Sequence, residues 1–377
     1  MRKLGIYVHV PFCESKCAYC NFISFKSDEE TKEKYVFALI KEMEMYKEKL
    51  KDCVIDTIFF GGGTPSCLRP KAVKNILNYI TNNFNVESDA EITIECNPNS
   101  ITREKLSEYK LAGVNRLSIG LQAYNNKLLK LIGRIHTIDD FDRAIKNAKS
   151  MGFENINVDL LLGLPKQKMY DVAFELKHLI KLNIPHFSCY GLIVEENTKL
   201  CRDLENKVYS LPSEENSVKM YNYTLNFLKK HGIFRYEVSN FAKKGFESKH
   251  NLKYWTMQEY VGFGLASHSF FDNERWENTS KLDEYFTLIE SGQLPRITLE
   301  KETNESLKEE FLMTGLRKQS GICLDEYEKM FNEDLLISKQ TEISKLFDEQ
   351  MVDIKDGRLF ATDKGFEFLN QIILNLV

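Results

Sequence analysis

The stretch YVHVPFCESKCAYCNF, residues 7–22, places three cysteines directly after a short apolar segment. Cys13, Cys17 and Cys20 have the spacing C-x3-C-x2-C. Cysteine thiolates bind iron–sulfur clusters, zinc and copper(I). A structural zinc ion needs four ligands and His9 is a candidate for the fourth, so a zinc-stapled, non-catalytic binding protein stays open. Three ligands in one loop also suit a four-iron cluster whose remaining iron is free to bind a small molecule.

Length and composition indicate a large domain with a smaller one attached. The chain has 377 residues, of which 43% are hydrophobic, enough for more than one packed core. The net charge of -4 gives no sign of a nucleic-acid partner. We see no signal peptide and no run that approaches the roughly 18–20 apolar residues of a membrane span. We therefore expect a cytoplasmic, reducing compartment, in which the six scattered cysteines are core thiols.

Apolar segments alternate with helical patterns through the first half of the chain. The expected strands are Leu4–Val10, Val54–Phe60, Glu91–Glu95, Asn115–Ile119, Ile156–Leu162 and Phe187–Leu192. The expected helices are Thr31–Leu50, one starting at Pro70, Thr102–Leu111, Thr137–Met151 and Tyr170–Leu182. Such alternation predicts a parallel α/β sheet, open or curled toward a barrel. The polar segments that follow these strands should then face one mouth.

The last quarter has a different pattern. From about residue 300 the sequence is mostly helical, until VDIKDGRLFA places Asp356-Gly357 between two short strands, a two-residue hairpin signal. A final helix, Lys364–Leu374, is expected to follow. We therefore divide the chain into a domain at 1–200, an intervening α+β segment at 201–300 and a winged-helix-like domain at 301–377. The last has 10 Lys/Arg against 16 Asp/Glu, which disfavours DNA binding.

The cysteine loop resembles the cluster loop of radical S-adenosylmethionine (SAM) enzymes. Within that superfamily, the sequence is similar along nearly its whole length to the anaerobic coproporphyrinogen III oxidase family, which includes haem chaperones. The resemblance implies a partial (β/α)6 barrel with a C-terminal helical, winged-helix-like domain. It also implies a [4Fe–4S] cluster on Cys13, Cys17 and Cys20, with SAM at the open iron.

The same resemblance implies which residues contact SAM. They match the family's contacts at similar spacing: Tyr7, Tyr19, Gly62, Gly63, Thr64, Glu95, Gln122, Arg134 and Asp159. In GGGTPS, residues 61–66, glycines permit close approach of the backbone to a ligand. Asp159 stands in an otherwise apolar strand, where a carboxylate needs a partner. No residue is assigned as catalytic, although His9 is a candidate proton donor or partner of a cluster sulfide.

Three features favour the chaperone branch of the family over the oxidase branch. The oxidase loop has a fourth cysteine two places after the third, and here that place is Phe22. The oxidase also has a longer segment before the loop than the twelve residues found here. The motif His250-Asn251-Leu252-Lys253-Tyr254-Trp255 matches the chaperone, and imidazole is a common haem ligand. His250 is thus the candidate haem ligand, with His268 as a second.

The sequence therefore predicts a haem chaperone that delivers haem to respiratory haemoproteins. The runner-up is an oxygen-independent coproporphyrinogen III oxidase, so enzymatic activity is left open. The expected cofactors are the [4Fe–4S] cluster, SAM and haem. The expected partners are haem and an acceptor haemoprotein that is reached at a membrane through a partner, with a homodimer left open and no nucleic acid.

Overall fold

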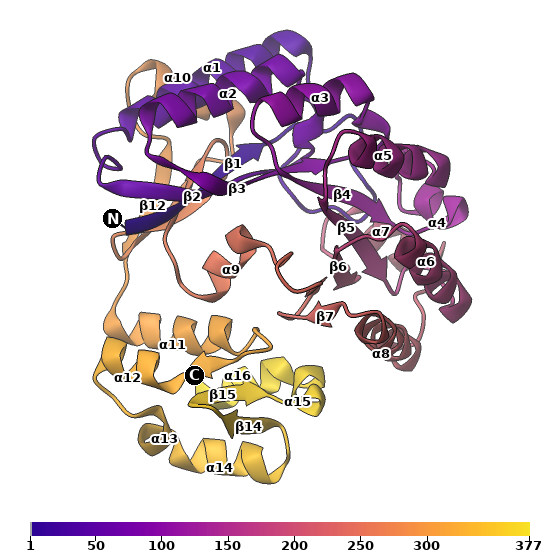
Figure 1. The fold of residues 1–377 in the computed structure, drawn as a ribbon, viewed down its shortest axis with the longest axis vertical. Coiled ribbons are helices and arrows are strands. Elements are labelled where there is room, and N and C mark those ends of the chain that lie inside the picture. The colour runs from indigo at the N-terminus through magenta and orange to yellow at the C-terminus, as the bar shows by residue number, and fades with distance from the viewer. Residues whose placement is uncertain (1) are drawn as a thin grey trace.

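The computed structural model describes residues 2–377 and is built around one twelve-stranded sheet (Figure 1). The strand order is β12-β11-β10-β9-β1-β2-β3-β4-β5-β6-β8-β7. Its first six strands are β1 Arg2–Val10, β2 Cys53–Gly62, β3 Val86–Cys96, β4 Arg116–Gln122, β5 Asn155–Leu162 and β6 His186–Gly191. These six are neighbours and all parallel, which confirms the predicted α/β class.

Helices follow the parallel strands and cover one side of the sheet (Figure 1). They are α1 Glu29–Met45, α2 Pro70–Asn83, α3 Arg103–Leu111, α4 Asn126–Leu131, α5 Ile138–Ser150 and α6 Met169–Lys181. Threonine caps explain the starts of α3 and α5, since Thr102 and Thr137 accept hydrogen bonds from backbone N–H groups in the first turn. Gly113 and Gly152 follow these helices with φ of +100° and +74°, a conformation that favours glycine.

The first predicted helix is shorter than expected. It was predicted to reach Leu50, but α1 ends at Met45 with Tyr46 as its cap. The chain continues in turns, and the N–H of Leu50 donates to the carbonyl of Tyr46 at 3.0 Å. Leu50 is still buried, because the turns bring it back against the core. The apolar periodicity therefore identified a buried position correctly but assigned it to the wrong kind of backbone.

Residues 201–300 extend the same sheet at both edges. β7 Phe234–Arg235 and β8 Asn240–Ala242 continue the β6 edge, and β9 Tyr260–Phe263 pairs with β1 in parallel. The remaining strands are β10 His268–Phe271, β11 Glu274–Asn278 and β12 Arg296–Lys301, and the helices are α7 Lys199–Glu205, α8 Glu214–Lys230, α9 Lys249–Trp255 and α10 Leu282–Glu290. Helix α9 lies on the open side of the sheet, between it and the C-terminal part (Figure 1). The domain limits at 200 and 300 stay predictions, while the sheet runs through both.

The C-terminal part has its own core and a small three-stranded sheet. The strands are β13 Ile322–Cys323, β14 Val352–Lys355 and β15 Arg358–Ala361, in the order β13-β15-β14, and the helices are α11 Asn304–Gly315, α12 Leu324–Phe331, α13 Leu335–Ser338, α14 Gln340–Asp348, α15 Asp363–Glu367 and α16 Leu369–Leu376. The predicted hairpin is confirmed, with φ of +51° at Asp356 and +71° at Gly357. The single predicted helix 364–374 is wrong, since the chain breaks at Phe368 between α15 and α16.

Candidate functional site

The cysteine loop is closed by its own backbone and anchored to neighbouring segments. The N–H of Cys13 donates to the carbonyl of Phe25, and the N–H of Phe25 donates to that of Pro11, both at 3.0 Å. The N–H of Ala18 donates to the carbonyl of Ile132 at 2.9 Å. All three loop cysteines are free thiols of intermediate exposure. The loop is thus held at both ends, while its thiols stay accessible from one side.

His9 does not join the cysteines. Its Nδ1 lies 3.2 Å from the Tyr7 hydroxyl and its Nε2 lies 3.4 Å from the carbonyl of Ile23. Burial lowers the pKa of His9 to about 4, so the ring is neutral at pH 7. Within residues 2–377 no three His, Cys, Asp or Glu side chains are gathered around a point where one metal ion would bind. This arrangement does not fit a tetrahedral zinc site, which requires four such ligands at one ion.

The glycine segment after β2 packs directly on the cysteine loop. Gly62 has φ of +107°, and a Cβ added there would lie 2.6 Å from Cε1 of His9. The N–H of Gly63 donates to Val10 and that of Thr64 to Phe12, both at 2.8 Å. These two N–H groups therefore lock the cysteine loop, and they are not free for a ligand. The Thr64 hydroxyl lies 3.4 Å from the Cys13 sulfur.

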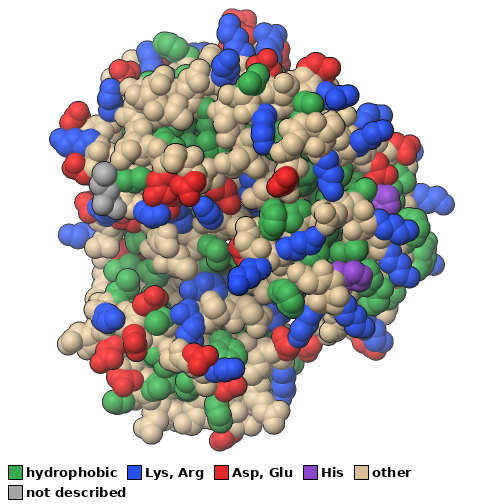
Figure 2. All heavy atoms as spheres, in the orientation of Figure 1, with side chains coloured by type: hydrophobic (Ala, Val, Ile, Leu, Met, Phe, Trp, Pro, Cys, Tyr) green, Lys and Arg blue, Asp and Glu red, His purple; other side chains and the backbone are tan. Residues whose placement is uncertain are grey.

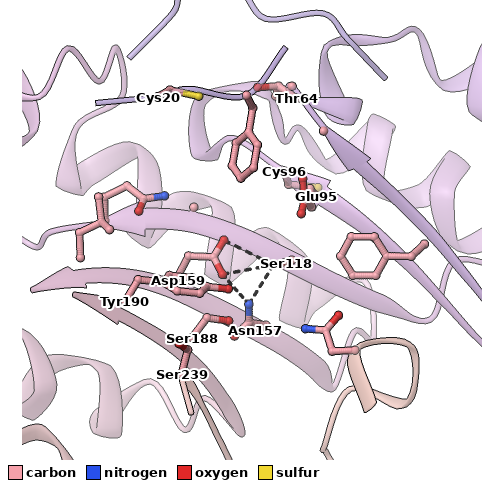
Figure 3. A pocket seen from close by; sticks show the side chains of 18 of the residues that line it. Cys20, Thr64, Glu95, Cys96, Ser118, Asn157, Asp159, Ser188, Tyr190 and Ser239 are labelled. Atoms are coloured by element: carbon pink, nitrogen blue, oxygen red, sulfur yellow. Dashed lines mark hydrogen bonds between the residues drawn. The ribbon is translucent and has the colours of Figure 1, made fainter. Parts of the chain in front are cut away.

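A cavity of about 690 Å³ opens beside the loop, on the side of the sheet that carries α9. It is lined by all but two of the predicted site residues: Tyr7, Cys13, Cys17, Tyr19, Cys20, Gly62, Gly63, Thr64, Glu95, Gln122, Arg134, Asp159 and His250. The exceptions are His9 and His268, which line a neighbouring cavity of about 400 Å³. Figure 3 shows Cys20 and Thr64 on one side of the larger cavity and Asp159, Ser188 and Tyr190 on the opposite side. The ends of the parallel strands thus meet at one mouth, as predicted.

Arg134 connects the cluster loop to the end of β4. Its Nη2 donates to the carbonyl of Gly120 at 2.7 Å and its Nη1 donates to the Cys17 sulfur at 3.5 Å. Gln122, at the end of the same strand, has φ of +71°, an uncommon conformation for a residue other than glycine. The backbone bends there, where the strand reaches the cavity.

Two of the carboxyl groups that line the cavity were predicted from the sequence, Glu95 and Asp159, and burial raises the pKa of each. The pKa of Glu95 is raised to about 8 by burial and by nearby Asp159, while the backbone of Gly62 and the charge of Arg116 oppose this rise. Burial also raises the pKa of Asp159, opposed by hydrogen bonds from Asn157 and Ser188. Asn157 Nδ2 donates to Asp159 at 2.7 Å, and the Ser118 hydroxyl lies 3.5 Å from it (Figure 3). Both carboxyls are poised to accept hydrogen bonds from a ligand that enters the cavity.

His250 is a buried residue with both ring nitrogens engaged. Its Nδ1 lies 2.8 Å from the Thr57 hydroxyl and its Nε2 lies 2.9 Å from that of Tyr254. The ring stacks on Phe59 at a centroid distance of 5.2 Å. Burial lowers the pKa of His250 to about 3, with a contribution from Lys253. Glu91 fixes the start of α9 by accepting from the N–H groups of Lys249 and His250, each at 3.1 Å.

Several polar cavity residues were missed by the sequence analysis. They share the wall opposite the cluster loop: Arg116, Ser118, Asn157, Ser188, Glu237, Asn240 and Arg317. The sequence does not set Arg116 apart, because the expected strand Asn115–Ile119 also contains the polar residues Asn115 and Ser118. The others come from segments without a motif. Only the fold brings them to the cavity.

The donor set fits a cluster and SAM together. A single cavity, large enough for a small molecule, is lined by three accessible thiols, by a guanidinium that contacts one of them, and by the carboxyl groups of Glu95 and Asp159. Residues 7–177 match the family model described as Radical SAM superfamily, and residues 303–368 match the HemN C-terminal domain. The fold and the thiol-lined cavity define a radical SAM protein. It therefore uses a [4Fe–4S] cluster and SAM.

Full-length relatives narrow the class. The chain is 35% identical to a protein of Lactococcus lactis named Heme chaperone HemW, over 97% of this chain and 95% of that protein. A Bacillus subtilis protein of the same name is 34% identical over 97% of both chains. The chain belongs to the HemW family. The solved structure of coproporphyrinogen III oxidase (HemN) from Escherichia coli has the same fold, with a TM-score of 0.89 at 22% identity over 100% of this chain and 90% of that one.

No helix in residues 2–377 has the length and apolar character that crossing a membrane requires.

Proposed function

We propose that this protein is a haem chaperone that binds haem and delivers it to respiratory haemoproteins. The observation that carries the proposal is the full-length similarity to two proteins named Heme chaperone HemW, at 34–35% identity. Phe22 adds support, since it stands in place of the oxidase's fourth cysteine and is 69% exposed at the edge of the cavity. The recipient is an acceptor haemoprotein at a membrane, served from the cytoplasm by a monomer or homodimer.

We assign the cluster to Cys13, Cys17 and Cys20. SAM is assigned to the cavity residues Tyr7, Tyr19, Gly62, Gly63, Thr64, Glu95, Gln122, Arg134 and Asp159. When bound, the reduced cluster supplies one electron to the sulfonium of SAM. The protein's own residues orient the ligand: Arg134 offers a cation for its carboxylate, and Glu95 offers an acceptor for ribose hydroxyls. The walls of the cavity limit access of water to this end.

His250 is the proposed haem ligand, and its two hydrogen bonds determine what must change before it can bind iron. Ligation through Nε2 requires the bond to Tyr254 to be given up, since both nitrogens are engaged. His268 is the second candidate. It is exposed, lines the smaller cavity with Tyr7 and Tyr254, and forms no side-chain hydrogen bond in the described part of the chain.

A haem titration tests the proposal. We expect a saturable Soret shift with the wild-type protein and a weaker one with His250→Ala. His231→Ala is the matched control, since His231 is exposed and bonds only the carbonyl of Phe227. Incubation with coproporphyrinogen III, SAM and a reductant should yield no protoporphyrinogen IX. Absence of haem binding would refute the chaperone function, and robust turnover would establish the oxidase instead.

A further inference from the structure

Two arginines in the cavity have no hydrogen-bond acceptor or ion pair for their guanidinium groups within residues 2–377, and the guanidinium of Arg317 lies over the Trp255 ring at 6.0 Å from its centroid. Arg116, the first residue of β4, is 1% exposed, and its Nε is fully buried without an acceptor. Arg317 follows α11 in the C-terminal part and is half-buried. Neither side chain forms a hydrogen bond or an ion pair with any residue in 2–377. Both line the same cavity as the cysteines.

An unpaired guanidinium in this position is costly. Arginine presents five N–H donors and stays protonated, so burial without an acceptor removes its hydration and provides no hydrogen bond in exchange. Arg134 shows the ordinary solution, since it donates to Gly120 and Cys17. Cavity carboxyls supply no hydrogen bond to either arginine, because Glu95 and Asp159 act on Arg116 only through space and Glu237 does the same on Arg317. The unpaired donors therefore indicate an anionic ligand.

Both arginines lie near one short segment, the turn between β7 and β8 that contains Tyr236 and Glu237. Arg116 opposes the rise that burial causes in the pKa of Tyr236, and Arg317 opposes the same rise in the pKa of Glu237. One arginine comes from the main sheet and the other from the C-terminal part, so the pair spans the junction of the two. Figure 2 shows further Lys and Arg side chains near the middle of this face, where these two parts meet.

We propose that Arg116 and Arg317 form a carboxylate-binding subsite that receives the propionate groups of the porphyrin. The proposal rests on the haem-binding function above and gives a role to the part of the cavity away from the cluster. Haem carries two neighbouring propionates, and guanidinium groups bind carboxylates through paired N–H donors. Phe59, Tyr254 and Trp255 line the same cavity and offer aromatic surface to the macrocycle. Arg317 couples occupancy of this subsite to the C-terminal part.

The test compares haem with haem dimethyl ester, in which both propionates are blocked. The full-length, cluster-loaded wild-type protein, Arg116→Gln and Arg317→Gln are titrated with each. The control is Arg143→Gln, which removes an exposed arginine of α5. We expect each cavity variant to bind haem about 10- to 100-fold more weakly, the range for a lost charge-assisted bond. The ester should bind wild type and variants with equal affinity, and Arg143→Gln should match wild type.

Three results would overturn the subsite. Unchanged haem affinity in both variants would do so, as would equal losses of haem and ester, or loss of SAM affinity in place of haem affinity. Failure of the wild type to bind haem would instead refute the haem function itself, and the propionate role with it. Thermal unfolding checks the fold: Arg116→Gln should be at least as stable as wild type without ligand, because it removes an unpaired buried charge. If it does not fold, half-buried Arg317 carries the comparison.

Discussion

Replacing Glu95 by glutamine should make the ligand-free protein more stable than the wild type, and this difference should grow as pH rises. The side chain has a pKa of about 8 in the folded protein, against an ordinary value of 4.5, chiefly because it is buried at the cavity wall. Between these two values the unfolded chain releases the proton and the folded chain retains it. Wild-type stability from this group is therefore complete below pH 4.5 and lost as pH rises through 8. Glutamine is neutral throughout and avoids that loss.

The size of the effect follows from the same numbers. A shift from 4.5 to about 8 corresponds to an upper limit of about 5 kcal/mol at 1.36 kcal/mol per pH unit. Because Glu95 borders the cavity, water there reduces this to about 2–3 kcal/mol. Urea unfolding of metal-free wild type and Glu95→Gln at pH 5, 7 and 9 measures the difference. A gap between the two proteins that stays constant from pH 5 to 9 would refute the reasoning.

Three further predictions concern the loop, the cofactor and the core. Gly62→Ala should lower the free energy of unfolding by about 1–3 kcal/mol and should lower iron loading in an iron and sulfide assay. The control is Gly152→Ala, where φ is +74° and nothing lies within 4 Å of the added Cβ, and it should keep full loading. Arg134→Lys should weaken SAM binding at least about tenfold in equilibrium dialysis, since lysine cannot span Gly120 and Cys17 together. Unchanged affinity would remove Arg134 from the site. Glu42→Ala should destabilise the protein by about 3–5 kcal/mol in urea unfolding, because Gly264, Asn278 and Tyr285 lose their shared acceptor; a loss below 1 kcal/mol would contradict it.

The strand-end side of the site could be predicted because parallel strands bring their carboxyl ends together. Glu95, Gln122 and Asp159 were each found at or near a strand end, and all three line the cavity. The twelve-stranded sheet could not be anticipated from the same rule. Strands β9 to β12 are short, and helix α10 separates β11 from β12. They join the sheet beside β1 through pairing that no local pattern specifies.

The opposite wall of the cavity depends on contacts between distant segments. Arg317 reaches the cavity from the C-terminal part, and Glu237 from the turn between β7 and β8. His250 was found through its motif, but its bonds to Thr57 and Tyr254 emerged only from the packing of α9 against β2. Sequence patterns thus located the candidate ligands, and the packing determined which of their atoms are free.

Electron paramagnetic resonance of the reduced protein tests the central claim most directly. After anaerobic reconstitution, the protein should carry a [4Fe–4S] cluster whose spectrum changes when SAM is added, because the proposed three-cysteine site leaves one iron for SAM to bind. Cys17→Ser should lose the cluster, whereas Cys323→Ser, outside the cavity, should retain both the cluster and the response. A stoichiometric zinc ion in place of iron, or a cluster spectrum that SAM leaves unchanged, would contradict the account.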